Sequence, residues 1–250
     1  MDSHQLNPTV QRILLWSGPA LVAVLVVALI PLAHLIPPPS PAHSREQIAD
    51  FFAMHTTGIR VGCVLMMIFF CFYATWSAVL IAWIRRTETG FPVLTYASVA
   101  IVGAGTVFFT IAPLTWAVAA FRPGDYAPET VRVLNDWAWF GILFSWPPFA
   151  VFCALITLAV FTDRNQPPVF PRWVGYYNAC EAVALCPFAL IAFFKTGPFA
   201  WDGVIGFYLP TAGFCVWLLV MTVVLFRAIR EAEASPASPH PARAPETAQA

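Results

Sequence analysis

Six long apolar stretches run through this chain, and nearly all of its charged residues fall between them. An α-helix needs about 20 apolar residues to cross the hydrocarbon core of a bilayer, and each stretch is long enough. Backbone groups in lipid must bond within the protein, and the stretches lack the strict alternation of barrel strands. We therefore predict an all-α polytopic membrane protein, a six-transmembrane-helix bundle surrounded by the lipid bilayer. The predicted spans cover residues 13–36, 60–84, 92–121, 135–161, 174–194 and 203–226.

Polar signals between the spans predict further helix starts. The pattern Ser44-Arg45-Glu46-Gln47 is typical of a capping box and predicts a short external helix over residues 44–55, lying at the membrane surface. Phe51 and Phe52 would dip from it into lipid or protein. Pro128-Glu129 suits the first turn of a helix, so the fourth helix is expected to begin outside the hydrocarbon.

The end of the chain has a different composition. From residue 231 it alternates Ala, Pro, Ser and Glu, which cannot bury enough apolar area to fold. We predict a six-span membrane domain over residues 1–230, followed by a disordered cytoplasmic tail over residues 231–250.

Prolines and glycines inside the spans predict kinks and close contacts. Trp146-Pro147-Pro148 lies deep in the fourth span, where proline removes a helix donor. The bend is either simply tolerated by the bundle or shapes a cavity. Pro113, Pro187 and Pro210 are further candidate kinks. Gly103-Ala104-Gly105 predicts close helix packing in the third span.

Composition agrees with a membrane protein and excludes other classes. Charged residues make up 10% of the chain, against roughly 25% in soluble domains. The formal net charge is zero, which gives no nucleic-acid footprint. The six cysteines all lie in apolar stretches without a CxxC pair, so we interpret them as small buried hydrophobes.

The basic residues predict the orientation in the membrane. With six spans, both termini and the second and fourth loops share one side, which carries eight of the thirteen basic residues. An excess of Lys and Arg marks the cytoplasmic side, so both termini are predicted there. The richness in Arg, Ala and Pro favours a bacterial source, hence a multi-pass protein of the bacterial plasma (inner) membrane. The two sets are Arg12, Arg85, Arg86, Arg164, Arg172, Arg227, Arg230 and Arg243 against Arg45, Arg60, Arg122, Arg132 and Lys195.

Glu181 is the clearest candidate functional residue. It falls about eight residues, or roughly 12 Å, into the fifth span, close to the membrane midplane. A carboxyl group at that depth is costly and suggests function by default. Tyr177 and Asn178 share its helix face. The alternative is a protonated glutamate that bonds to a neighbouring helix and has a purely structural role.

A second polar cluster is predicted at the external boundary. Arg132 and Asp136 fall four residues apart on one helix face, and Trp139 flanks that face. With Arg60 at the start of the second span, these residues would ring the mouth of a cavity that narrows toward Glu181. Trp146 would lie deeper along the same helix. Ion pairs between surface charges are the alternative interpretation.

No metal or cofactor site is predicted. His34, His55, Asp50 and Asp136 are suitable ligand types, but their spacing matches no ligand signature. Only His34 lies within a predicted span, which disfavours a haem held by two histidines. The single lysine, Lys195, lies at a span end and argues against a retinal Schiff base.

These features leave three functional hypotheses. The first is binding or transport of a small apolar or amphipathic molecule in a cavity near Glu181. The second is a membrane-embedded enzyme that uses Glu181 and Asp136 for acid–base chemistry on a lipid or isoprenoid. The third is a non-catalytic subunit or assembly factor of a membrane complex, and a homo-oligomer is also compatible with the sequence.

Overall fold

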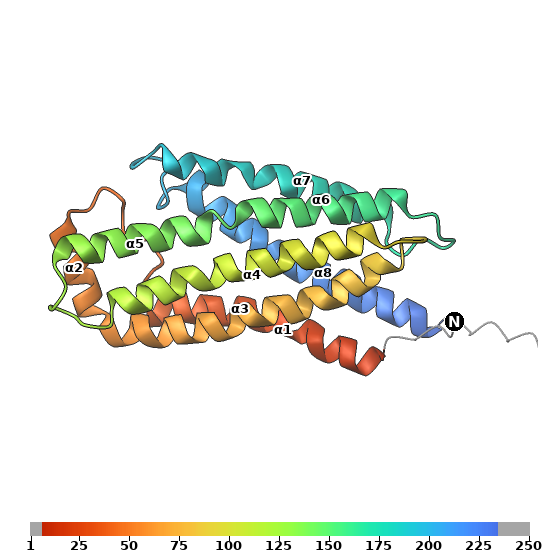
Figure 1. Cartoon of the computed structure of the whole chain (residues 1–250), viewed down its shortest axis with the longest axis horizontal. Coiled ribbons are helices and arrows are strands. Elements are labelled where there is room, and N and C mark those ends of the chain that lie inside the picture. Colours follow the sequence, from red (N-terminus) through yellow and green to blue (C-terminus); the bar gives the residue numbers. More distant parts are fainter. Residues whose placement is uncertain (1–6, 235–250) are drawn as a thin grey trace, which may run out of the picture.

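The computed structural model describes residues 7–234, which fold entirely into helices and connecting loops (Figure 1). The α-helices are α1 (Pro8–Val27), α2 (Arg45–Met54), α3 (Thr56–Arg85), α4 (Val93–Ala119), α5 (Pro128–Leu143), α6 (Trp146–Thr162), α7 (Arg172–Ala184) and α8 (Leu209–Ala234). Two π-helical turns, η1 (Ala28–Leu32) and η3 (Val204–Tyr208), and a 3₁₀ segment, η2 (Cys186–Ala192), complete the described helices.

Six helical segments of the described chain are long and apolar enough to cross a membrane, which confirms the predicted fold class. They are Pro8–Leu32, Thr56–Arg85, Val93–Ala119, Pro128–Thr162, Arg172–Ala192 and Val204–Ala234. The last one reaches beyond its predicted end, so the expected tail starts inside α8. The rest of that tail lies outside the described residues.

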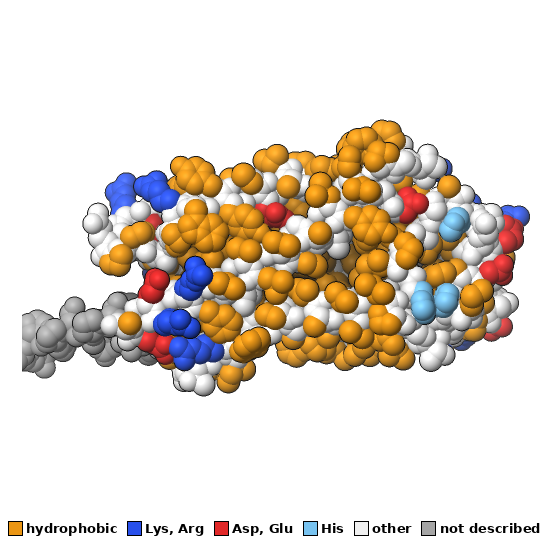
Figure 2. All heavy atoms as spheres, turned by 180° about the vertical axis from the view of Figure 1, so that it is seen from behind, with side chains coloured by type: hydrophobic (Ala, Val, Ile, Leu, Met, Phe, Trp, Pro, Cys, Tyr) orange, Lys and Arg blue, Asp and Glu red, His pale blue; other side chains and the backbone are white. Residues whose placement is uncertain are grey.

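The surface has the distribution that a bilayer requires. Figure 2 shows a broad apolar band around the middle of the molecule, with most charged side chains at its two ends. Many large apolar side chains of the spans are well exposed, among them Ile13, Val107 and Leu209. An apolar surface of this extent is unstable in water and stable in lipid. The protein is therefore a multi-pass membrane protein.

The helices pack side by side along the long axis of the molecule (Figure 1). α3 packs against α1 and α4, α4 also packs against α5 and α6, and α6 packs against α7. α1 packs against α8, and Arg12 forms an ion pair with Glu233, so the first and last described helices meet at one end. We call this the terminal end, and the opposite one the α2 end.

The short helix α2 begins with the predicted capping box. Ser44 Oγ accepts from the backbone N–H of Gln47 at 3.2 Å, and the Ser44 N–H donates to Gln47 Oε1 at 2.8 Å. α2 packs against α5. Phe52 is buried and Phe51 packs against the same apolar cluster, so both rings are inserted into protein.

The fourth span consists of two helices rather than one. α5 begins at Pro128 as predicted, ends at Leu143, and is separated from α6 by Phe144 and Ser145. Pro147 and Pro148 occupy the first turn of α6, where a missing N–H costs nothing. The predicted kink is therefore a complete interruption of the helix.

Small residues bring some helices together, but not all of those expected to do so. Gly105 faces Pro148 across the α4–α6 contact, whereas Gly103 has open space around its Cα. All six cysteines are unpaired, and the prediction that all are buried is wrong for Cys71, Cys180 and Cys186, which are exposed on the outer surface.

Candidate functional site

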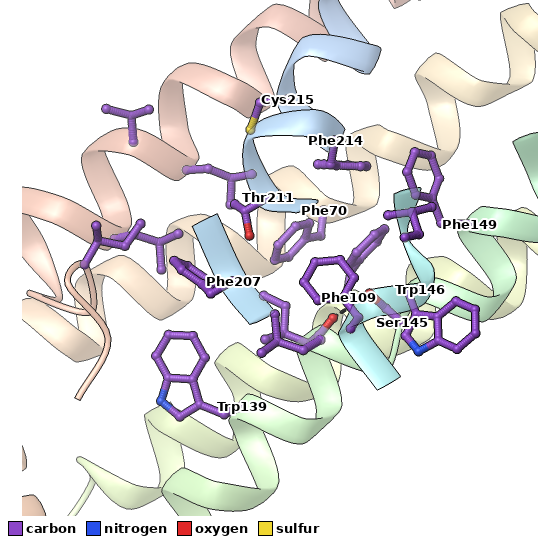
Figure 3. A pocket seen from close by; sticks show the side chains of 18 of the residues that line it. Phe70, Phe109, Trp139, Ser145, Trp146, Phe149, Phe207, Thr211, Phe214 and Cys215 are labelled. Atoms are coloured by element: carbon purple, nitrogen blue, oxygen red, sulfur yellow. Dashed lines mark hydrogen bonds between the residues drawn. The ribbon is translucent and has the colours of Figure 1, made fainter. Parts of the chain in front are cut away.

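The bundle contains a partly open cavity of about 190 Å³, lined by side chains from all six spans. Figure 3 shows phenylalanine rings from α3, α4, α6 and α8 converging on it, together with Trp139 and Trp146. These two tryptophans are the cavity residues that the sequence predicted. The phenylalanines were missed because their chain positions do not distinguish them from lipid-facing ones. They are Phe70, Phe109, Phe149, Phe188, Phe207 and Phe214.

Helix irregularities create this space. The π turns contribute Leu29 and Phe207 to the lining, the α5–α6 interruption contributes Ser145, and the 3₁₀ segment contributes Phe188. A π turn widens the helix by one extra residue, and a 3₁₀ turn narrows it. The signal available from the sequence was the set of prolines within the spans.

The cavity lining is almost entirely apolar. Within residues 7–234, no Asp, Glu, Lys, Arg or His lines it, and its polar side chains are Ser145, Thr211 and Cys215. The Ser145 hydroxyl donates to the Ile142 carbonyl at 2.5 Å. An ion would lose its hydration in this space without compensation, so the site suits neutral molecules.

The tryptophans that line the cavity differ from the other buried ones. The indole N–H groups of Trp116, Trp139 and Trp146 have no hydrogen-bond partner among the described residues, and their nitrogens are enclosed. Buried indoles normally find an acceptor. Those elsewhere in the core do, at 2.8–2.9 Å: Trp76 to Thr222, Trp83 to Gln11, Trp201 to the Pro39 carbonyl and Trp217 to Asn178. The unused donors are thus concentrated around the cavity.

Glu181 is buried, with 8% of its surface exposed, but it does not line the cavity. It faces α8 at Gly213, where a Cβ atom would lie 3.1 Å from Glu181 Oε1. Its carboxyl group makes no hydrogen bond to the described residues. Leu185, one helical turn further on, does line the cavity, so Glu181 lies one turn beyond its wall.

The predicted neighbours of Glu181 have other contacts. The Asn178 side chain donates to the Val174 carbonyl at 2.8 Å and accepts from Trp217 Nε1 at 2.9 Å. Tyr177 is partly buried, and its ring lies 6.3 Å from that of Trp173. Neither side chain lines the cavity. Asn178 joins two helices instead.

The predicted mouth residues gather at the α2 end but form an ordinary charge network. Arg132 pairs with Glu129 at 2.7 Å, which in turn lies 3.8 Å from Arg45. Asp136 interacts electrostatically with Arg132 and Lys195. Arg60 lies apart, 5.7 Å above the Phe121 ring. None of Arg60, Arg132 and Asp136 lines the cavity.

Two of the candidate metal ligands meet at the same end. The His34 and His55 rings lie 4.3 Å apart between centroids. Burial, and secondarily the proximity of His34, lowers the pKa of His55 below its usual 6.5. Within the described residues no three or more His, Cys, Asp or Glu side chains cluster as metal ligands.

Comparisons with known proteins add no further assignment: no family model, curated protein or solved structure matches the chain.

Proposed function

We propose that this membrane protein binds a small, neutral, apolar or amphipathic molecule in the cavity within its bundle. The observation that carries the proposal is the space between the helices, lined almost entirely by aromatic and aliphatic side chains. Protein interiors are close-packed, and voids larger than a water molecule are few. The two π turns, the 3₁₀ segment and the α5–α6 break all border this void. A bound molecule explains that coincidence better than incomplete packing of the helices does.

The size of the cavity limits that occupant. An apolar protein cavity of about 150 Å³ stays dry and binds benzene. At about 190 Å³, this cavity accommodates a substituted ring or an isoprenoid fragment of similar size. Longer molecules would extend from it between the helices into the lipid.

The unpaired tryptophans favour an amphipathic occupant over a pure hydrocarbon. An oxygen acceptor on the molecule would satisfy an indole N–H group that now lacks a partner. Since the nitrogens of Trp116, Trp139 and Trp146 are all enclosed, the indole ring that forms this bond must first turn. The adjoining free space makes that turn feasible.

Binding is favoured over catalysis by the same geometry. The enzyme hypothesis requires Glu181 and Asp136 to face the substrate, and neither side chain lines the cavity. Movement of the molecule across the membrane would be a further property of the binding protein. The excess of arginines at the terminal end supports a cytoplasmic position for both termini, and composition supports a bacterial inner membrane.

Filling the cavity tests the proposal. Cys215 lines it, whereas Cys71 is exposed on the outer surface of α3, so Cys215→Phe and Cys71→Phe form a matched pair. The purified protein in detergent is titrated with iodobenzene, and quenching of tryptophan fluorescence is followed. Cys215→Phe should lower the affinity obtained from saturable quenching by roughly tenfold or more, because the new ring occupies the site. Cys71→Phe should leave that affinity unchanged.

Two further variants separate the outcomes. Thr211→Leu, a smaller filling change, should give an intermediate loss if Cys215→Phe is unstable. Glu181→Gln should retain binding, because Glu181 lies outside the wall. Equal saturable quenching in wild type, Cys215→Phe and Thr211→Leu would disprove binding in the cavity, while loss in Glu181→Gln alone would restore a role for the carboxyl group.

A further inference from the structure

The α2 end carries a close pair of histidines from separate segments of the chain. His34 follows the π turn η1, and His55 lies between α2 and α3. Their ring centroids are 4.3 Å apart and the ring planes are inclined by 35°. Figure 2 shows histidine side chains gathered at this end of the molecule, away from the apolar band.

The backbone fixes both residues in place. His34 has φ +53°, the one non-glycine residue with positive φ among residues 7–234. Positive φ is uncommon outside glycine and, where it occurs, is concentrated at functional sites. The His55 N–H donates to the Phe51 carbonyl at 3.1 Å, and its carbonyl accepts from Ile59 at 2.9 Å. Gly58 brings α3 against the Leu32 carbonyl, close to His34.

The spacing of the rings is that of two imidazoles on one ion. Metal–nitrogen bonds are about 2.0–2.1 Å, which places each ring centre about 3.2 Å from the metal. With a right angle between the bonds, as in square-planar sites, the centres would be about 4.5 Å apart. The observed separation of 4.3 Å is close to this value. A shared ion also requires one nitrogen of each ring to point to a common position, and rotation about the Cβ–Cγ bond of histidine is soft enough to allow this.

We propose that His34 and His55 together bind one divalent late transition-metal ion, with Cu²⁺ held most tightly. Imidazole ligands in a cis arrangement suit Cu²⁺ and Ni²⁺, and affinity among divalent ions peaks at Cu²⁺. The site is separate from the cavity and does not depend on its proposed function.

The surroundings of the two histidines leave the proposed metal site accessible to solvent, unlike a closed structural metal site. His34 is exposed, so an ion can reach the pair, while Phe51 covers His55 with ring centroids 5.0 Å apart. Structural zinc sites close with four protein ligands. Here the described residues supply two, and the remaining positions take water or a second ligand. The ion is therefore exchangeable.

The experiment uses the full chain in detergent with His4 and His240 replaced by alanine, so that His34, His43 and His55 are the remaining histidines. Cu²⁺ binding is measured by titration calorimetry and by electron paramagnetic resonance. We expect one ion per chain with a spectrum of nitrogen coordination. Ni²⁺ and Zn²⁺ should compete for the site, and Mg²⁺ should not.

Three variants decide the outcome. His55→Gln and His34→Asn each remove one ligand, and asparagine tolerates the positive φ. Either change should weaken Cu²⁺ binding by roughly tenfold or more, since losing even an outer-shell partner costs about 10- to 100-fold. The control His43→Gln, in the neighbouring loop, should bind as the parent. Unchanged affinity in both ligand variants, or a loss confined to His43→Gln, would overturn the proposal.

Discussion

Trp217 donates its indole N–H to the side-chain oxygen of Asn178 over 2.9 Å, and this bond joins α8 to α7. Both side chains are fully buried. The sequence placed Asn178 beside a ligand, yet its side chain is engaged between helices, as is common where polar groups associate helices in lipid.

Removing Asn178 should therefore weaken the bundle. Asn178→Leu leaves Trp217 Nε1 as a buried donor without an acceptor, which costs about 1–3 kcal/mol. Unfolding in increasing dodecyl sulfate would measure the loss. Adding Trp217→Phe should recover part of it, with a coupling energy of about 1 kcal/mol. Cys180→Leu, at an exposed position of the same helix, is the control and should change little.

Two glycines with opposite surroundings give a paired test of helix packing. A Cβ at Gly58 would lie 2.0 Å from the Leu32 carbonyl oxygen, whereas Gly103 has nothing within 4 Å. Gly58→Ala should lower the free energy of unfolding by about 1–3 kcal/mol or more through overpacking. Gly103→Ala should be neutral or stabilising by up to about 1 kcal/mol, because alanine favours helix. Equal effects on thermal unfolding would contradict the packing of η1 on α3.

The stability of the metal-free protein should fall in mild acid through His55. Its folded pKa is lowered from 6.5, so below that pH the unfolded chain binds more protons than the folded one. Stability is then lost as pH falls from about 6.5 toward the lower folded pKa. Thermal unfolding with a chelator, compared between wild type and His55→Gln, would show this. The variant should have a flatter pH profile, and parallel profiles would refute the assignment.

Hydropathy and local capping signals were enough to predict the architecture. The spans follow from the length of the apolar stretches, and α2 follows from the spacing of Ser44 and Gln47. The consecutive prolines Pro147 and Pro148 marked a bend that proved to be a break between helices. Each of these features depends only on residues close together in the chain.

It was much harder to predict which side of each helix faces lipid and which faces the protein interior. A helix that is apolar on all sides has no stripe to distinguish lipid from protein, so Cys63 and Cys71 on α3 looked alike, although one is buried and the other exposed. Whether a residue near Glu181 borders the cavity depends on where the helix turns widen or tighten. The π turns carry no sequence signal as distinct as a capping box, and they decide which side chains border the cavity.

The participation of all six spans in the cavity wall has a consequence for biogenesis. A nascent chain halted before α8 would lack Thr211, Phe214 and Cys215, and with them one side of the chamber. An occupant that binds only the finished enclosure stabilises completed molecules over truncated ones. Binding of the molecule would then favour the survival of completely inserted chains over chains that lack α8.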